Sequence, residues 1–315
     1  MLINLVQILE YLDSNHISYE VNGDNINVKK MASINANVHD SFCYYVGNDP
    51  VKLRSIERSI IICNLGFSTD NYKNTYILTQ NPQLSFYLAS SLFASKSDCK
   101  ISCESVISEH AEIGNNASIG PFCNIEKCKI GENVIIESGV KVKDGTVIGN
   151  NVYIQENTVI GATGVLWAWG DNQTKIRCVQ TGNVIIKDNV FIGANITIVK
   201  GTFENSPTII GGNTMIAHGT MIGHGVVIGE NNHFANNVSI AGSVITGENC
   251  FFGSGVSVRP HIKLADDIVV GTGAVVVKDF EIPGITIIGN PAKKIVSEKG
   301  KKSGVPAPLN TKKDK

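Results

Sequence analysis

The chain has 315 residues, a formal net charge of −1 and a sequence pI near 6.7. This balance gives no electrostatic basis for binding nucleic acid or an anionic membrane surface. No apolar run reaches the roughly 18 residues of a membrane span, and the N-terminal stretch lacks the basic segment of a signal peptide. We therefore expect a cytoplasmic protein with reduced packing cysteines and no bound metal, because Cys99 and Cys103 lack a second close pair.

The first hundred residues mix two periodicities. Apolar residues at helical spacing predict short helices over 2–12 and 83–93. Alternating or buried apolar runs predict strands over 26–34, 42–46, 59–63 and 75–78. These elements predict a small α/β domain over residues 1–103.

From Ile107 to Val276, a large and mostly aliphatic residue recurs with a period of six, often followed by Gly, Asn or Asp, with one five-residue step from Ile125 to Ile130. Neither the helical period of 3.6 nor the strand period of 2 produces this spacing, and a β-sandwich would place turns every 8–12 residues. Three hexads make an eighteen-residue triangular coil, and stacked coils bury a continuous apolar column. The repeat therefore predicts a mainly β fold, a parallel β-helix over residues 104–296.

Two segments interrupt the hexads. The series runs to Leu166 and breaks over 167–182, which contains Trp167 and Trp169, and it breaks again over 199–208. Exposed tryptophan is unfavourable unless it packs on something, so the first segment is expected either to contact a neighbouring subunit or to line the acyl or nucleotide site. Loops that leave a rigid scaffold often carry function.

The hexads resemble those of the hexapeptide-repeat acyltransferases, which implies a left-handed parallel β-helix and a homotrimer with sites between subunits. The N-terminal helix, the small domain, the segment from Asn81-Pro82 to Phe86 and the two interruptions more narrowly resemble the UDP-3-O-acylglucosamine N-acyltransferases of lipid A biosynthesis. In that family an aromatic residue and an Asn of the small domain help to hold uracil. Tyr44 and Asn48 are the nearest matches here, and a core Tyr and a turn Asn are the alternatives.

The segment 221–231 resembles the active-site segment of that family, and His224 falls on its catalytic histidine. An amine must lose a proton as it attacks a thioester, and an imidazole, with an ordinary pKa of about 6.5, suits that task. Gly242 lies eighteen residues later, so coil geometry places it on the adjacent strand, where its N–H can stabilise an oxyanion. The family's glycine at this offset has that role.

Three further positions follow from the same resemblance. His261 corresponds to a second family histidine near the substrate and is a candidate contact for substrate or phosphate. The family's acidic residue seven before the catalytic histidine is Ala217 here, so Glu204 and Asn205 of the second interruption are candidates for orienting the ring. His218 occupies the corner of the preceding face, from which a trimer could bring it to the cleft.

The C-terminal part, 271–279 and 288–295, resembles the CoA-dependent sugar acetyltransferases, in which a Gly-x-Pro-Ala-Lys segment lies along CoA. Capping of the solenoid is the structural alternative. The resemblance implies these cofactor-contact candidates: Gly271, Gly273, Lys278, Asn290, Pro291, Ala292 and Lys293. The Lys-rich residues 297–315 contain few apolar side chains and predict a disordered tail.

The leading hypothesis is an N-acyltransferase that moves an acetyl or short acyl group from CoA to the amine of a nucleotide-linked amino sugar for surface polysaccharide or lipopolysaccharide. The alternative enzyme is the lipid A acyltransferase, which uses a hydroxyacyl carrier protein. A zinc-dependent β-helix carbonic anhydrase fits the histidine spacings poorly, and a structural β-helix without catalysis is a further alternative.

Overall fold

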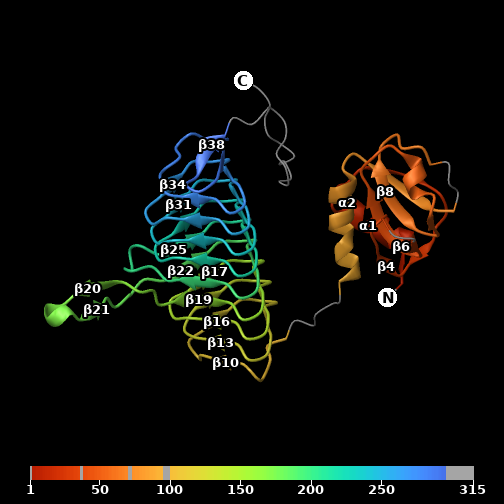
Figure 1. Ribbon diagram of the computed structural model, residues 1–315. Helices are drawn as coiled ribbons and strands as arrows, with labels where there is room; N and C mark the ends of the chain where they lie inside the picture. The colour runs from red at the N-terminus through yellow and green to blue at the C-terminus, as the bar shows by residue number, and fades with distance from the viewer. Residues whose placement is uncertain (1, 36–37, 70–72, 95–99, 296–315) are drawn as a thin grey trace. The chain divides into compact units, whose positions relative to one another are not determined.

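The structure is a computed structural model that describes residues 2–35, 38–69, 73–94 and 100–295. The chain divides into two compact units, residues 1–97 and 98–315. Figure 1 shows the helices of the first unit and the stacked coils of the second. Within the described residues, no helix is both long enough and apolar enough to cross a membrane.

The first unit contains a five-stranded sheet with the order β2-β9-β8-β6-β4, in which only β2 is antiparallel to its neighbour. Its elements are β1 (Ile3–Asn4), α1 (Leu5–Ser14), β2 (Tyr19–Asn22), β3 (Asn27–Val28), β4 (Lys30–Met31), β5 (Val38–His39), β6 (Ser41–Tyr45), η1 (Pro50–Leu53), β7 (Ile56–Glu57), β8 (Ile60–Asn64), β9 (Thr75–Thr79), α2 (Pro82–Ser90) and η2 (Ser91–Phe93). Successive residues of β8 are buried on opposite faces of the sheet, as expected of a strand covered on both sides.

The expected first helix and first strand of this unit have different bounds in the structure. The first helix begins at Leu5 rather than residue 2, because Asn4 caps it: the Asn4 Oδ1 accepts from the Gln7 N–H at 2.9 Å, and the Gln7 side chain accepts from the Asn4 N–H. The expected strand over 26–34 is two short strands with different partners, since β3 pairs with β1 and β4 pairs with β6.

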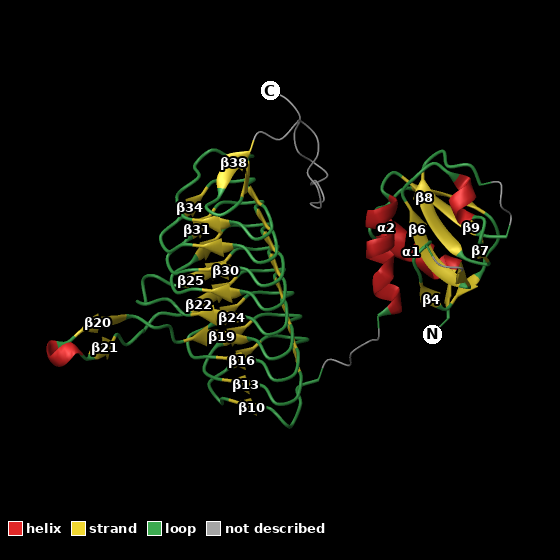
Figure 2. Cartoon of the chain, viewed as in Figure 1, coloured by secondary structure: helices red, strands yellow, loops and turns green. Residues whose placement is uncertain are grey.

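The second unit is a parallel β-solenoid, which confirms the predicted left-handed β-helix class. Each coil contributes one strand to each of three sheets, and Figure 2 shows the strands stacked coil above coil. Residues eighteen apart are neighbours, as Ile222 is paired with Ile240 and Ile240 with Val258. The inward aliphatic residues form one continuous core, in which the rings of Phe234 and Phe252 stack at 4.4 Å.

The bounds of the solenoid strands follow the three sheets. The nine-stranded sheet contains β10 (Val106–Ile107), β13 (Asn124–Ile125), β16 (Lys141–Val142), β19 (Val159–Ala162), β24 (Thr197–Val199), β27 (Met221–Ile222), β30 (Ser239–Ile240), β33 (Ser257–Val258) and β36 (Val275–Val276). The eight-stranded sheet contains β11 (Glu112–Ile113), β14 (Lys129–Ile130), β17 (Val147–Ile148), β22 (Val184–Ile186), β25 (Thr208–Ile210), β28 (Val227–Ile228), β31 (Ile245–Thr246) and β34 (Lys263–Leu264). The ten-stranded sheet contains β12 (Ser118–Ile119), β15 (Ile135–Ile136), β18 (Tyr153–Ile154), β23 (Phe191–Ile192), β26 (Met215–Ile216), β29 (His233–Phe234), β32 (Phe251–Phe252), β35 (Val269–Val270), β37 (Thr286–Ile288) and β38 (Lys293–Ile295).

Asparagines line one edge of the solenoid, where the eight-stranded sheet passes to the ten-stranded sheet. We call this the ladder edge. Its turns place Asn or Asp at positive φ, the conformation that these residues tolerate best after Gly; the positions are Asn116, Asn133, Asn151, Asn189, Asn213, Asn231, Asn249 and Asp267. The side-chain amides of the first four bond one to the next at 3.1–3.2 Å.

Both interruptions leave the solenoid at another edge, where the nine-stranded sheet passes to the eight-stranded sheet. The first forms an arm with an antiparallel hairpin, β20 (Trp167–Trp169) and β21 (Lys175–Arg177), joined by the short helix η3 (Asp171–Gln173). Figure 1 shows this arm projecting from the coil stack. The expected hexad at Leu166 is wrong, because Leu166 lies on the arm, where its carbonyl accepts from the Cys178 N–H at 2.8 Å.

The C-terminal end of the described solenoid is a hairpin of β37 and β38. Strand β37 continues the ten-stranded sheet from β35, and β38 pairs back on it in antiparallel orientation. The predicted disordered tail, 297–315, lies outside the described residues.

Candidate functional site

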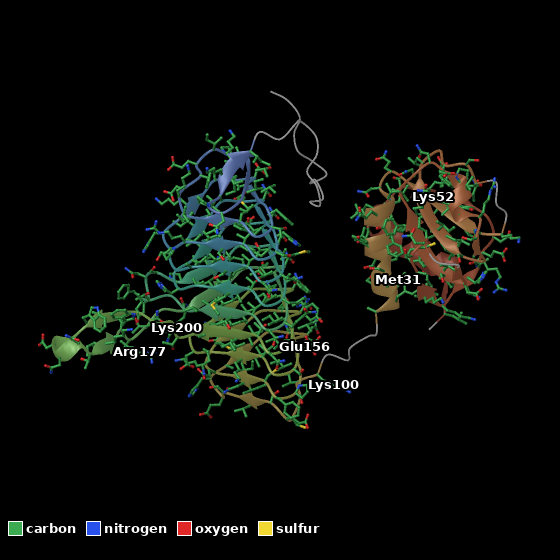
Figure 3. The ribbon with its side chains drawn as sticks, viewed as in Figure 1. Met31, Lys52, Lys100, Glu156, Arg177 and Lys200 are labelled. Atoms are coloured by element: carbon green, nitrogen blue, oxygen red, sulfur yellow. The ribbon has the colours of Figure 1, made fainter. Side chains whose placement is uncertain are left out.

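The chemically useful side chains gather along the edge that carries both interruptions. We call it the site edge, and it comprises turns 163–183, 200–207, 223–226, 241–244 and 259–262. Because turns at one edge of a solenoid stack above one another, residues far apart in sequence meet there. Figure 3 shows Arg177 on the arm and Lys200 where the arm meets the coil stack.

These turns surround an open cleft of about 630 Å³. The arm and the second interruption supply apolar walls, and three later coils supply the polar floor. The lining residues are Leu166, Trp167, Ala168, Ile176, Arg177, Cys178, Thr202, Phe203, Ser206, His224, Gly225, Ser243 and His261. The cleft therefore combines an imidazole and hydroxyl groups with an apolar surface that can accommodate hydrocarbon.

The ring of His224 lies directly over Gly242. A Cβ atom added to Gly242 would be nearest Nε2 of His224, 2.6 Å from its Cε1 and 2.9 Å from its Cδ2, so any side chain there would displace the ring. Backbone hydrogen bonds hold the adjoining turns: the Ser243 N–H donates to the His224 carbonyl at 2.8 Å, and the His261 N–H donates to the Gly242 carbonyl at 3.1 Å. Among the described residues, the Gly242 N–H donates to no protein acceptor.

The neighbour of the other ring nitrogen was not expected from the sequence. Nδ1 of His224 lies 3.4 Å from Oγ1 of Thr202. Glu204 and Asn205, the expected orienting residues, are exposed and do not line the cleft. Thr202 takes that place because the second interruption returns beneath the turn of His224.

The arm and the later coils bring further expected residues to the cleft. His261 lines it at positive φ, and Trp167 forms part of its wall. Trp169 does not line the cleft; its ring packs edge-on against Trp167 at 4.9 Å. The Lys175 ammonium lies 4.5 Å from the centroid of Trp167, within the range of a cation–π contact.

Other expected residues lie away from the cleft of a single chain. His218 is at the edge where the ten-stranded sheet passes to the nine-stranded sheet, and its Nδ1 accepts from the Ala194 N–H at 3.0 Å. Gly271, Gly273 and the C-terminal turn share that edge; in the turn Asn290, Pro291 and Lys293 are exposed, whereas the Ala292 side chain is buried. Lys278 lies one coil beyond the turn of His261, with its ammonium 5.5 Å from the ring centroid of Phe280.

Tyr44 and Asn48 belong to the N-terminal unit, which has its own pocket. Tyr44 lines this pocket of about 610 Å³, and its ring lies 4.8 Å from that of Phe86. A hydrogen bond with Tyr87, with some help from burial, raises the pKa of Tyr44. Asn48 is exposed and is not part of the pocket lining.

The sequence did not identify Thr202, Phe203, Ser206 and Arg177 as site residues. They lie in interruptions, where the period of six no longer assigns a direction to each side chain. Ser243 could have been found from its place beside Gly242. Among the described residues, no group of three or more His, Cys, Asp or Glu side chains is arranged to hold a metal ion.

Comparisons with known proteins agree on the repeat. The bacterial transferase hexapeptide (six repeats) family matches residues 127–162 and 207–242, and the hexapeptide repeat of succinyl-transferase matches 243–278. The UDP-3-O-acylglucosamine N-acyltransferase of Sinorhizobium fredii is 32% identical over 93 residues, which is 30% of this chain. The match spans about a fifth of that relative (21%).

Solved structures of sugar-nucleotide acyltransferases are similar to the solenoid. The UDP-N-acetylglucosamine O-acyltransferase of Moraxella catarrhalis has a TM-score of 0.56 and 28% identity, covering 62% of this chain and 73% of that chain. The Francisella novicida UDP-N-acetylglucosamine acyltransferase has a TM-score of 0.56 and 29% identity, covering 62% of this chain and 68% of that chain.

Proposed function

Because hexapeptide-repeat transferase models match residues 127–162 and 207–278, we propose that this chain is an N-acyltransferase whose acceptor is the amine of a nucleotide-linked amino sugar. The observation that carries the proposal is the placement of the His224 ring over Gly242 inside a cleft with apolar walls. That placement combines a base, an oxyanion donor and room for an acyl chain.

In the proposed mechanism His224 is the general base. The mechanism requires the tautomer in which Nδ1 carries the proton and donates to Oγ1 of Thr202, because that tautomer leaves the lone pair of Nε2 directed towards the Gly242 turn. The acceptor amine attacks the thioester carbonyl carbon as Nε2 takes its proton, and a C–N bond forms. Charge develops on the carbonyl oxygen, and the free N–H of Gly242 donates to it. The C–S bond then breaks, and the imidazolium returns its proton to the leaving thiolate.

The substrate classes are inferred from the cleft and the relatives. The similar proteins are named as acyltransferases of UDP-linked glucosamine derivatives, which supports a nucleotide-linked sugar as acceptor. Trp167 and Phe203 offer aromatic surface to an acyl group or a sugar, and His261 can donate to a hydroxyl or phosphate oxygen at the same cleft. Tyr44, in the pocket of the small domain, is the proposed stacking partner for the base, with Asn48 as a second candidate.

We propose CoA as the carrier of an acetyl or short acyl group. Its anionic groups suit Lys278 and Lys293, with Gly271, Gly273 and the turn of Asn290, Pro291 and Ala292 as backbone contacts. The second candidate is the acyltransferase of lipid A biosynthesis, with a hydroxyacyl carrier protein as donor. It is kept because the matched Sinorhizobium relative is named a UDP-3-O-acylglucosamine N-acyltransferase. The apolar walls of the cleft are compatible with either acyl group.

We propose a homotrimer in the cytoplasm, with each cleft completed by a neighbouring subunit. His218 and the C-terminal turn share one edge, and His224 lies on the next edge. Two such edges from neighbouring copies can line one site. Trp169 is 63% exposed on the projecting arm and is available to such a contact.

The test is thiol release from acetyl-CoA and longer acyl-CoAs, with UDP- and dTDP-linked amino sugars as acceptors. Release should require an amino sugar and should fall about 10²–10⁴-fold in His224→Ala, the range for loss of a general base. Turnover only with a hydroxyacyl carrier protein would establish the second candidate instead. Full activity of His224→Ala would contradict both.

A further inference from the structure

Beside the cleft is a smaller pocket of about 300 Å³ at the base of the arm. Its lining residues are Thr163, Arg177, Cys178, Val179, Gln180 and Lys200. Arg177 and Cys178 line both this pocket and the cleft of His224, so the two spaces adjoin. None of the reaction steps proposed above uses this pocket.

Gln180 is the unusual member of the set, because its side chain is buried but only one of its two hydrogen-bonding groups has a partner. Gln180 is 4% exposed, and its Oε1 accepts from the Gly164 N–H at 2.6 Å. Its Nε2 has no hydrogen-bond partner among the described residues. If the amide were flipped, its NH₂ group would face the Gly164 N–H, and two donors would oppose each other. Oε1 therefore faces Gly164, and Nε2 is the end of the amide that has no partner.

A buried donor without a partner is costly and calls for an acceptor from outside the chain. Arg177 and Lys200 line the same pocket, and neither forms an ion pair with a carboxylate of the described residues. Lys200 does act on one acid, Glu126, whose pKa is lowered first by a hydrogen bond from Lys143 and, to a smaller extent, by the charge of Lys200. Its oxygens already accept from Lys143 and from the Asp144 N–H.

We propose that this pocket is a phosphate-binding subsite in which the Gln180 Nε2 donates to a phosphate oxygen between Arg177 and Lys200. Arg suits this role because its guanidinium can donate two parallel hydrogen bonds to a phosphate. The inference deepens the proposed function and rests on it for the two sources of the phosphate. One is the diphosphate of the nucleotide-linked sugar, and the other is the phosphate of the thioester carrier.

The experiment is isothermal titration calorimetry on the full chain with four ligands: UDP, uridine, CoA and pantetheine. Gln180→Glu keeps the acceptor for the Gly164 N–H but replaces the NH₂ donor with an oxygen. Gln173→Glu is the matched control, because it makes the same charge change at the exposed tip of the arm. Lys200→Gln is a second test that leaves the buried amide intact.

Affinity for the phosphate-bearing ligand should fall roughly 10-fold or more in Gln180→Glu, as expected for a lost hydrogen bond to a charged group. Uridine and pantetheine should bind equally in all variants. A loss confined to UDP assigns the pocket to the acceptor, and a loss confined to CoA assigns it to the carrier. Unchanged affinities for both in Gln180→Glu and Lys200→Gln would overturn the subsite.

Calorimetry with inorganic pyrophosphate separates this inference from the proposed function. Pyrophosphate binding that depends on Gln180, in a protein that transfers no acyl group, would support the subsite and refute the function. Acyl transfer at the wild-type rate in Gln180→Glu, with unchanged affinities for UDP, CoA and pyrophosphate, would refute the subsite alone.

Discussion

The ladder edge and the site edge are built from the same repeat but differ in what their turns contain. At the ladder edge, Asn occupies the positive-φ position in coil after coil, and in the first four coils each amide bonds to the next. At the site edge the corresponding turns carry Gly225, Ser243 and His261, and two other turns are expanded into the arm and the second interruption. A uniform edge stabilises the stack, so another edge is free to vary and to hold a site.

The largest effect should come from placing a methyl group at equivalent positions of the two edges. Gly242 and Gly212 both stand second after an inward isoleucine. Gly242→Ala would push its Cβ into the His224 ring, whereas at Gly212 the nearest atom is the Asp188 carbonyl oxygen at 3.3 Å. We expect about a 10²-fold loss of kcat/KM for Gly242→Ala, typical of a misplaced catalytic group.

Steady-state kinetics on both variants, with melting temperatures as the measure of folding, tests this difference. Gly212→Ala should retain activity within a few-fold. Equal losses in the two variants at unchanged melting temperature would mean that the His224 ring does not depend on the space above Gly242.

The next effect concerns stability at the ladder edge. Asn151 has φ 55°, and its amide donates to Asn189 at 3.2 Å while its oxygen accepts from Asn133. Asn151→Ala should lower the unfolding free energy by about 2 kcal/mol, because strain at positive φ adds to the loss of hydrogen bonds. Asn151→Gly tolerates the backbone and should lose only about 1 kcal/mol. Urea denaturation measures both, and a larger loss for Gly than for Ala would refute the strain argument.

The smallest effect is a pH dependence on the outer face of the ten-stranded sheet. The ring of His233 stacks on Phe251 at 5.2 Å, and burial lowers the pKa of His233 below its ordinary value of 6.5. The unfolded chain therefore binds this proton more readily than the folded chain, so the neutral ring's contribution to stability is present above about pH 6.5 and is lost as the pH falls below it.

His233→Phe should remove that part of the pH dependence. The melting temperature of the wild type, relative to the variant, should decrease between pH 7.5 and pH 5. Parallel melting curves across this range would contradict the assignment, since every other titrating group is common to both chains.

The repeat made the solenoid and the pairing of His224 with Gly242 predictable. A period of six admits few folds, and a coil of eighteen residues fixes which residues are neighbours. The same reasoning failed at Leu166, because an aliphatic residue at the right spacing lies on the arm when the chain leaves the sheet after Ala162. The period of six predicts whether a side chain points into the core only where the hexads are uninterrupted.

The ring neighbour of His224 shows the other limit. Glu204 and Asn205 have side chains suited to orienting the ring, but the path of the second interruption places Thr202 at Nδ1. Loop paths depend on contacts such as the Thr181 N–H with the Thr202 carbonyl at 3.1 Å, which join two interruptions that no repeat relates. The burial of Gln180 and its bond to the Gly164 N–H likewise follow from the path of the arm and not from the period of six.

The arm has a consequence for how proteins of this architecture diversify. Val147 and Ile185 are paired although the whole arm lies between them in the sequence. Their register is the same as that of Val227 and Ile245, which are separated by a single uninterrupted coil. The register of the strands therefore does not depend on the length of the segment inserted at the turn between them. Insertions and deletions at this edge can accumulate, and whole hairpins can be exchanged between relatives, while the register of the coils above and below is preserved.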